Sequence, residues 1–249
     1  MFLFAAGVLG GALNSVAGGG SFIAFPALLF TGVAPVSANA TNTLALFVGV
    51  TASGGAYRKH LDISRRVLIP LIVASVLGGL AGAFLLIRTP AQTFLRVLPW
   101  LLLGATLLFA FGKYLTGRIR ADISHEASTA ALAGACIFEL VVAVYGGYFG
   151  GGLGFMNLAM LAAIGMTNIH AMNALKAVLG GVINGVATVT FIATGAIAWP
   201  QAMVMILGAV AGGYGGAHYA QKLPQSWIRA FVIFVGAAMT IYFFLRAYA

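Results

Sequence analysis

The sequence predicts an all-α protein that crosses a membrane several times. Three observations lead to this prediction: 61% of the 249 residues are hydrophobic, only 7% are charged, and the mean hydropathy is +1.04. Soluble domains contain about 25% charged residues. Long apolar runs with few charges are typical of transmembrane helices. We therefore expect a polytopic helical membrane protein that is surrounded by the lipid bilayer.

Charged residues are absent from long stretches of the chain. Residues 1–57 contain no Lys, Arg, Asp, Glu or His, and between Glu126 and Lys222 the only Asp, Glu, Lys or Arg residues are Glu139 and Lys176. In a membrane protein the net charge of +9 indicates basic cytoplasmic loops, so we expect no nucleic-acid partner. The sequence contains no phosphate-binding loop, no metal-ligand spacing and no nucleophile–base pair. We therefore expect no cofactor, no metal and no enzymatic activity.

The apolar runs form two similar sets. The first set comprises residues 2–16, 21–31, 36–57, 67–87 and 93–112. The second set comprises residues 129–149, 153–165, 171–194, 200–220 and 227–246. Landmarks recur between the sets at a nearly constant offset, since Pro90 and Pro224 are 134 residues apart and Phe22 and Phe155 are 133 apart. Such an offset indicates an internal duplication.

The duplication divides the chain into two homologous repeats of about four membrane helices each. We assign the first repeat to residues 1–112 and the second to residues 129–249. Residues 113–128 form a polar linker, which we expect on the cytoplasmic side because it contains several basic residues.

A run of glycines interrupts each repeat. The residues concerned are Gly18, Gly19 and Gly20 in the first repeat and Gly150, Gly151 and Gly152 in the second. Because glycine weakens a helix, we expect a break there, and unpaired backbone groups are tolerated in hydrocarbon only where they face protein, a cavity or a ligand. The runs that follow, 21–31 and 153–165, are too short to cross alone, since crossing needs about 20 residues. We therefore predict half-helices that meet near the midplane, an arrangement typical of secondary transporters.

The basic residues leave two orientations open. We expect the linker and the segment 58–66, which contains Arg58, Lys59, Arg65 and Arg66, in the cytoplasm. If each glycine-broken pair is one crossing, both termini lie inside. If each pair re-enters, the repeats are inverted and both termini lie outside. The second arrangement also puts Lys222 and Arg229 inside, which favours inverted repeats.

Polar and small residues line one face of the run at 171–194. Helical spacing groups on this face Asn173, Lys176, Gly180, Asn184 and Thr188. A lysine at the centre of a membrane helix costs roughly 2.5–3.5 kcal/mol, so Lys176 predicts a partner, water or a ligand nearby. We interpret it as a cation that binds an anion or takes part in coupling. The alternative is a snorkelling or structurally paired lysine.

The first repeat carries uncharged polar residues on the equivalent face. These residues are Asn39, Asn42 and Thr43, and Asn42 aligns with Lys176 at the offset of 134. Asn and Thr side chains supply hydrogen-bond donors without charge, as a substrate site requires. The alternative is that they form hydrogen bonds between helices and only hold the bundle together.

The helices that follow the glycine runs begin near Ser21 and Leu153, so their free N–H groups and positive dipole ends are suited to an anion. Asn157, in the first turn of the second of these helices, adds a side-chain donor. The alternative for the glycines is close packing between helices. Glu139 has three interpretations: it pairs with Lys176, it carries a coupling proton, or it lies near the membrane surface.

The sequence resembles the sulfite exporter TauE/SafE family, also called the toluene-sulfonate uptake permeases. The resemblance covers essentially the whole chain. It rests on Ala17–Leu29, Gly32, Ala40–Asn42 and Gly147–Gly154. It implies a carrier in the bacterial inner membrane for small sulfur-containing or organic anions. Members usually have a longer glycine run in the first repeat and a longer N-terminal helix than this chain.

These observations together predict a secondary transporter that exports sulfite, sulfoacetate or another organosulfonate by alternating access, with protons or Na+ as the coupling ion. One alternative is an importer, or a carrier of a small carboxylate or other organic anion, with the same architecture. Another, from a different class, is a membrane subunit that transports nothing. The anion, the direction, the coupling ion and the oligomeric state stay open at this point.

Overall fold

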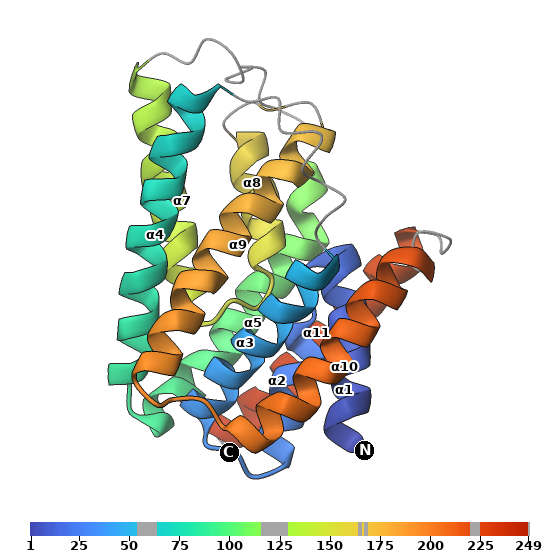
Figure 1. Ribbon diagram of the computed structural model, residues 1–249. Helices are drawn as coiled ribbons and strands as arrows, with labels where there is room; N and C mark the ends of the chain where they lie inside the picture. Colours follow the sequence, from blue (N-terminus) through green and yellow to red (C-terminus); the bar gives the residue numbers. More distant parts are fainter. Residues whose placement is uncertain (54–63, 116–128, 164–165, 167–168, 220–224, 249) are drawn as a thin grey trace.

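The computed structural model describes residues 1–53, 64–115, 129–163, 166, 169–219 and 225–248 (Figure 1). These residues form ten α-helices and no strand, which confirms the predicted all-α class. The helices are α1 (Phe2–Ala17), α2 (Ser21–Phe30), α3 (Pro35–Ser53), α4 (Arg65–Arg88), α5 (Ala91–Leu115), α7 (Thr129–Tyr148), α8 (Leu153–Ala163), α9 (Ile169–Ala193), α10 (Trp199–Tyr219) and α11 (Gln225–Tyr248).

The helices follow the apolar runs closely, with one difference at the linker. α5 continues to Leu115, so its last turn includes residues that we had assigned to the linker. Residues 113–115, which extend the helix, include no proline that would end it. The rest of the linker lies outside the described residues, as do Arg58, Lys59 and Lys222.

Two helix pairs enter the bundle from opposite ends. Figure 1 shows α1 starting at the end of the bundle that carries both termini, and α2 returning towards that same end. α7 starts at the opposite end, where α4 and α9 also begin, and α8 returns towards it. The turn between α1 and α2 and the turn between α7 and α8 therefore both lie within the bundle rather than at its ends.

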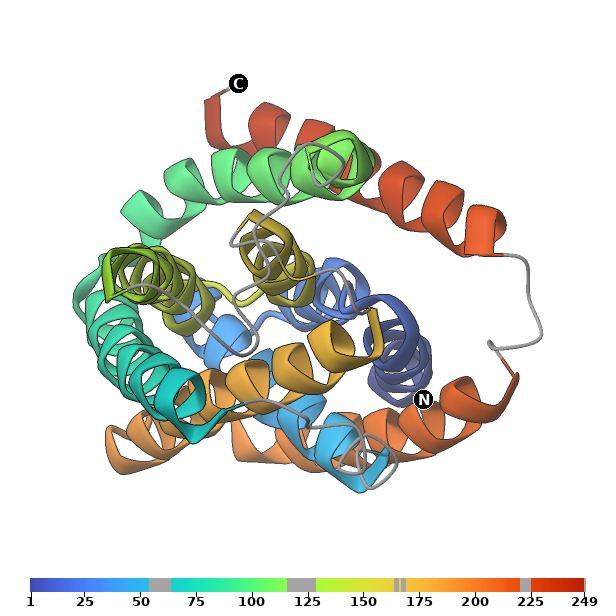
Figure 2. The ribbon, with the colours of Figure 1, turned by 90° about the horizontal axis from the view of Figure 1, so that it is seen from above.

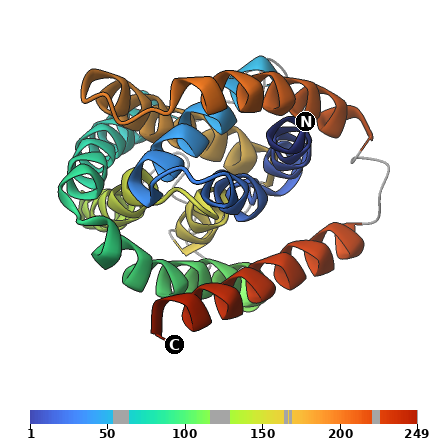
Figure 3. The ribbon, with the colours of Figure 1, turned by 90° about the horizontal axis from the view of Figure 1, so that it is seen from below.

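The view along the bundle shows which helices surround these turns. α5 and α11 pack together along one side (Figure 2), and α3, α9 and α10 lie on the other side. α2 and α8 lie between these two groups (Figure 3). α2 is almost completely enclosed, since eight of its ten residues are buried: Ser21, Phe22, Ala24, Phe25, Pro26, Ala27, Leu28 and Leu29.

Glycines allow two pairs of helices to approach very closely. α1 packs against α10, and α4 packs against α7. A Cβ atom added at Gly212 of α10 would collide with the carbonyl oxygen of Val8, and one added at Gly82 of α4 would collide with that of Val144. Backbones meet in this way where small residues let membrane helices pack. Each pair therefore joins a helix from before residue 112 to one from after residue 129.

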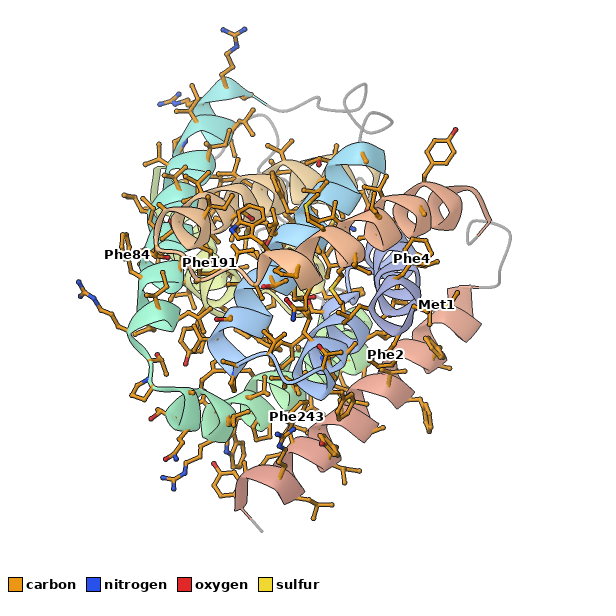
Figure 4. The ribbon with its side chains drawn as sticks, turned by 60° about the horizontal axis from the view of Figure 1, so that its bottom comes forward. Met1, Phe2, Phe4, Phe84, Phe191 and Phe243 are labelled. Atoms are coloured by element: carbon orange, nitrogen blue, oxygen red, sulfur yellow. The ribbon has the colours of Figure 1, made fainter. Side chains whose placement is uncertain are left out.

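Apolar side chains cover much of the outer surface. Phe2, Phe4 and Phe84 are exposed, whereas Phe191 and Phe243 are fully buried (Figure 4). By length and composition, two of the described helices are apolar enough to cross a membrane, Arg65–Arg88 and Ala171–Ala193. An outer surface of this kind suits lipid rather than water.

The glycine contacts give a direct test of the packing. We expect Gly212→Ala to lower the midpoint of thermal unfolding in detergent, because the added methyl group would push α1 away from α10. Overpacking of this kind costs about 1–3 kcal/mol. Gly215→Ala on the same helix is the matched control, since no described atom beyond its chain neighbours and its own helix backbone lies within 4 Å of its added Cβ. An equal fall in both variants would contradict the close approach of these helices.

Candidate functional site

Two turns rich in glycine lie at the ends of α1 and α7. The first glycine turn, Gly18–Gly20, begins with Gly18 at φ +72°, where its N–H caps α1 by donating to the Asn14 carbonyl over 3.0 Å. The second glycine turn, Phe149–Gly152, contains Gly150 at φ +72° and Gly152 at φ +78°. Because only glycine adopts these left-handed conformations without strain, the sequence ends both helices there.

The two turns are brought together in the interior. A Cβ atom on Gly18 would lie 3.3 Å from the Cα of Gly154, and one on Gly154 would lie 3.5 Å from the Cα of Gly18. Gly154 is the second residue of α8. The end of α1 and the start of α8 are thus in backbone contact, although they are far apart in the sequence.

Lys176 of α9 lies at this junction. Its Cδ is 3.6 Å from the Cβ position of Gly154, and the ammonium group is two bonds further along. Within the described residues, Lys176 makes no hydrogen bond or ion pair. The start of a helix carries a partial positive charge, so an unpaired ammonium beside it is electrostatically unfavourable. The ammonium group and the helix start therefore both make the junction positive, and a bound anion would relieve the repulsion between them.

The same region contains backbone N–H groups of the second glycine turn and of the first turn of α8. Leu153 N–H donates to the Gly150 carbonyl over 3.3 Å, and Phe155 N–H donates to the Gly152 carbonyl over 2.9 Å. No hydrogen bond within the described part of the chain uses the N–H of Gly151, Gly152 or Gly154. Free N–H groups at a helix start are the usual donors to bound oxyanions.

α9 turns its polar face towards α8 and the second glycine turn. Asn157 of α8 is fully buried, and its Nδ2 is 3.7 Å from the Cβ position of Gly180. The Oδ1 of Asn184 is 3.7 Å from the Cβ position of Gly150. Among the described residues, neither amide atom of Asn157 has a hydrogen-bond partner. A buried amide without partners is costly, so Asn157 is a candidate ligand-binding side chain.

Polar side chains of α3 tie this helix to residues beside the two turns. Asn42 Nδ2 donates to Ser21 Oγ at the start of α2 over 3.0 Å. Asn39 Nδ2 donates to the carbonyl of Tyr148 at the end of α7 over 3.0 Å. Thr43 behaves differently, because its hydroxyl donates to the Asn39 carbonyl within α3 over 2.9 Å. Asn39 therefore holds the backbone at the end of α7, and Asn42 holds the Ser21 side chain at the start of α2. Each asparagine keeps an Oδ1 without a partner in the described structure.

The remaining predicted residues contribute in other ways. Gly20 lies close to α1, because an added Cβ would collide with the Gly10 carbonyl oxygen. Gly19 is buried, and its carbonyl accepts from Phe22 N–H over 3.1 Å. Asn173 lies one turn before Lys176 on α9 and is half-buried. In the described residues no group of three or more His, Cys, Asp or Glu side chains could hold a metal ion.

Glu139 lies apart from this junction, between α7 and α4. It is fully buried, and the hydroxyl of Ser75 donates to its Oε1 over 2.5 Å. Its Oε2 has no partner in the described part of the protein. Its partner is thus Ser75, and no ion pair joins it to Lys176 there.

Two tertiary contacts were missed by the sequence analysis. The hydroxyl of Tyr145 donates to the Gly151 carbonyl over 2.6 Å and lies 3.4 Å from the Leu101 carbonyl, so it ties the second glycine turn to α5. Thr41 Oγ1 accepts from the N–H of Ala198 over 3.0 Å, just before α10. The position of Tyr145 directly before Gly146 and Gly147 was a usable signal. Nothing near Thr41 in the sequence indicates a contact with Ala198.

Comparison with known proteins identifies relatives along nearly the whole chain. The sequence profile of the sulfite exporter TauE/SafE family matches residues 3–243. No solved structure matches the chain significantly.

Three curated relatives are named as membrane transporters. The probable membrane transporter protein ORF9 of a Sinorhizobium species is 27% identical over 241 residues, covering 96% of this chain and 90% of the relative. The probable membrane transporter protein YfcA of Escherichia coli K12 is 29% identical over 245 residues, covering 96% and 87%. A probable membrane transporter protein of Xylella fastidiosa strain 9a5c is 30% identical over 256 residues, covering 98% and 94%.

The hydroxyl of Tyr145 gives a test of how the second glycine turn is held. We expect Tyr145→Phe to speed amide hydrogen exchange in peptides that cover residues 149–153, because the Gly151 carbonyl loses its donor. Such a loss costs about 1 kcal/mol or more when the acceptor is buried. Tyr242→Phe is the control, since that side chain lies on the exposed face of α11. Unchanged exchange in Tyr145→Phe would show that the turn is held by other contacts.

Proposed function

Because this chain belongs to the sulfite exporter TauE/SafE family, we propose that it is a secondary transporter that exports a small anion such as sulfite, sulfoacetate or another organosulfonate by alternating access. The family is one of membrane transporters and not of enzymes, and the apolar helices agree with a location in a membrane. We also propose that this membrane is the bacterial inner membrane and that the chain crosses it several times.

One observation carries the proposal: Lys176 packs against the start of α8, where backbone N–H groups have no acceptor among the described residues. A lysine ammonium and a helix N-terminus repel each other unless an anion lies between them. Sulfite and sulfonates present three oxygens that accept hydrogen bonds from such donors. Asn157, one turn further along α8, offers an additional unpaired amide.

We propose that the substrate site is formed where the two glycine turns meet. Lys176, Asn157 and the N–H groups of the second glycine turn would contact the anion directly. Asn39 and Asn42 would hold the turns in position, and each would offer one free amide oxygen. The whole proposed set is Gly18, Gly19, Gly20, Ser21, Asn39, Asn42, Thr43, Gly150, Gly151, Gly152, Asn157, Asn173 and Lys176.

We further propose that the chain consists of two inverted repeats, 1–112 and 129–249, joined by the cytoplasmic linker 113–128. Two features support this arrangement. The α1–α2 pair and the α7–α8 pair enter the bundle from opposite ends (Figure 1). In addition, the first helix of each repeat packs against the fourth helix of the other repeat, as α1 does with α10 and α7 with α4. Such symmetry gives alternating access two related conformations of similar energy.

The substrate and the direction require a transport assay. The purified protein in liposomes would be tested for exchange of radiolabelled sulfite, sulfoacetate, taurine-like sulfonates and small carboxylates. Preference for a carboxylate would identify the alternative carrier, and inward transport under physiological gradients would identify an importer. Exchange of none of these anions would contradict the proposal and favour a subunit that transports nothing.

The role of Lys176 can be tested by removing its charge. We expect Lys176→Ala to lower the rate of anion exchange by about tenfold or more at equal abundance in the membrane. Lys176→Arg should restore only part of the rate, because a planar guanidinium does not replace a compact ammonium. Arg246→Ala, which removes one positive charge from the exposed end of α11, is the control. Wild-type exchange by Lys176→Ala would sink the proposed anion site.

A substitution at Gly154 distinguishes a binding role of the glycines from a packing role. A Cβ there would lie 3.5 Å from Gly18 and 3.6 Å from Lys176, which are ordinary contact distances, so Gly154→Ala should fold normally. The methyl group would crowd an anion at the start of α8. We therefore expect about tenfold weaker anion binding, or 1.4 kcal/mol, with an unchanged unfolding midpoint.

The control for this experiment is Gly181→Ala, whose added Cβ meets no described atom within 4 Å beyond its chain neighbours and its own helix backbone. Gly151→Ala is less suitable, because its Cβ would lie 2.5 Å from the ring of Phe149 and would disturb the turn itself. A lower unfolding midpoint in Gly154→Ala with unaltered anion affinity would assign Gly154 to packing.

A further inference from the structure

The Glu139–Ser75 pair is the polar contact of the α4–α7 interface that the proposed anion site does not use. Glu139 and Ser75 are both fully buried, and the Oε2 of Glu139 has no partner among the described residues. Burying a carboxyl group in an apolar interface is costly. If the pair served packing alone, two helices packed in this way would need a polar pair between them.

The corresponding interface between α1 and α10 shows that two helices pack in this way without such a polar pair. At the offset of 132 that relates the two glycine runs, Glu139 corresponds to Gly7, and at the offset of 134, Ser75 corresponds to Ala209. These two residues face each other, since a Cβ on Gly7 would lie 3.2 Å from the N of Ala209. The same helix packing is therefore achieved with glycine and alanine, and the carboxyl group is an addition particular to α4–α7.

The pair lies deep within the bundle. Ser75 is ten residues from the start of α4 and Glu139 is ten residues from the start of α7. Ten helical residues span about 15 Å, which is about half the thickness of the hydrocarbon core. Towards the helix starts, the same faces continue with the buried apolar residues Leu71 and Ala135. Away from the helix starts, backbone contacts at Gly78 and Gly82 close the interface.

No cation compensates the carboxyl group within the described residues. On α7 the neighbouring titratable group is the thiol of Cys136, one turn away. The charged residues of α4 lie at its ends, Arg65 and Arg66 at the start and Arg88 at the end. Lys176 of α9 makes no ion pair with Glu139. An isolated carboxylate in such surroundings costs far more than a neutral carboxylic acid.

We propose that Glu139 carries the coupling proton of the transport cycle. It takes a proton from water on one side of the membrane, holds it while the α4–α7 interface is closed, and releases it to water on the other side. No other bond forms or breaks. α7 connects this event to the anion site, because nine residues after Glu139 the helix ends at Tyr148 and leads into the second glycine turn. This inference rests on the proposed transport function.

The test separates proton-driven net transport from anion exchange in the same liposomes. In the wild type, a pH gradient should drive net movement of a radiolabelled anion. Glu139→Gln keeps the shape of the side chain but binds no proton, so we expect it to lose about tenfold or more of the pH-driven transport. Its exchange of labelled for unlabelled anion at equal pH should stay within about twofold of wild type, since exchange needs no proton release.

Two further variants guard against a purely structural effect. Glu139→Asp should retain pH-driven transport, because it keeps a carboxyl group. Ser75→Ala should also retain it, because the proton carrier remains although its hydrogen-bond donor is lost. Full pH-driven transport by Glu139→Gln would overturn the inference. Equal loss of exchange and pH-driven transport in Glu139→Gln would overturn it as well.

The wild type distinguishes failure of this inference from failure of the proposed function. Anion exchange without any response to a pH gradient would reject Glu139 as a proton carrier and leave the transport function intact. Absence of exchange for every anion tested would reject the transport function, and the proton role would fall with it.

Discussion

Backbone groups inside an apolar protein need partners, and this constraint governs the two glycine turns. Each turn lies in the interior, where one helix ends and the next begins, and so leaves N–H and carbonyl groups without intrahelical partners. The side chains of Asn39 and Tyr145 satisfy carbonyls of Tyr148 and Gly151. The N–H groups of the second glycine turn remain without protein acceptors in the described structure. The protein thus satisfies acceptors and leaves donors available, which is the polarity that an anion requires.

Packing between the two halves of the chain fixes where these donors lie. α1 and α10 approach through Gly7, Gly11 and Gly212, and α4 and α7 approach through Gly78 and Gly82. Since each pair joins a helix of one half to a helix of the other, neither half could form these interfaces alone. The contact between Gly18 and Gly154 is a consequence, because α1 and α8 belong to different halves. A change in how the halves pack would therefore alter the proposed anion site itself.

The two charged residues in the interior occupy different surroundings. Lys176 lies on α9 beside free backbone donors, so its charge is suited to a ligand. Glu139 lies in the α4–α7 interface with a hydroxyl donor and no cation nearby among the described residues, so its surroundings favour the uncharged form. α7 connects them mechanically, since it carries Glu139 at its centre and the second glycine turn at its end. The proposed anion site and the proposed proton carrier are thus separate, and α7 would couple them without direct contact.

Composition and glycine spacing determined the helical class, the family resemblance and most helix ends, because these depend on local properties of the chain. Gly18 and Gly150 end helices through their left-handed conformations, which few other residues adopt. The tertiary structure alone decided which polar groups meet. Glu139 pairs with Ser75, 64 residues away, rather than with Lys176, and Asn39 reaches Tyr148, 109 residues away. Residue spacing along one helix cannot reveal such partners, because they depend on how helices from both halves cross in space.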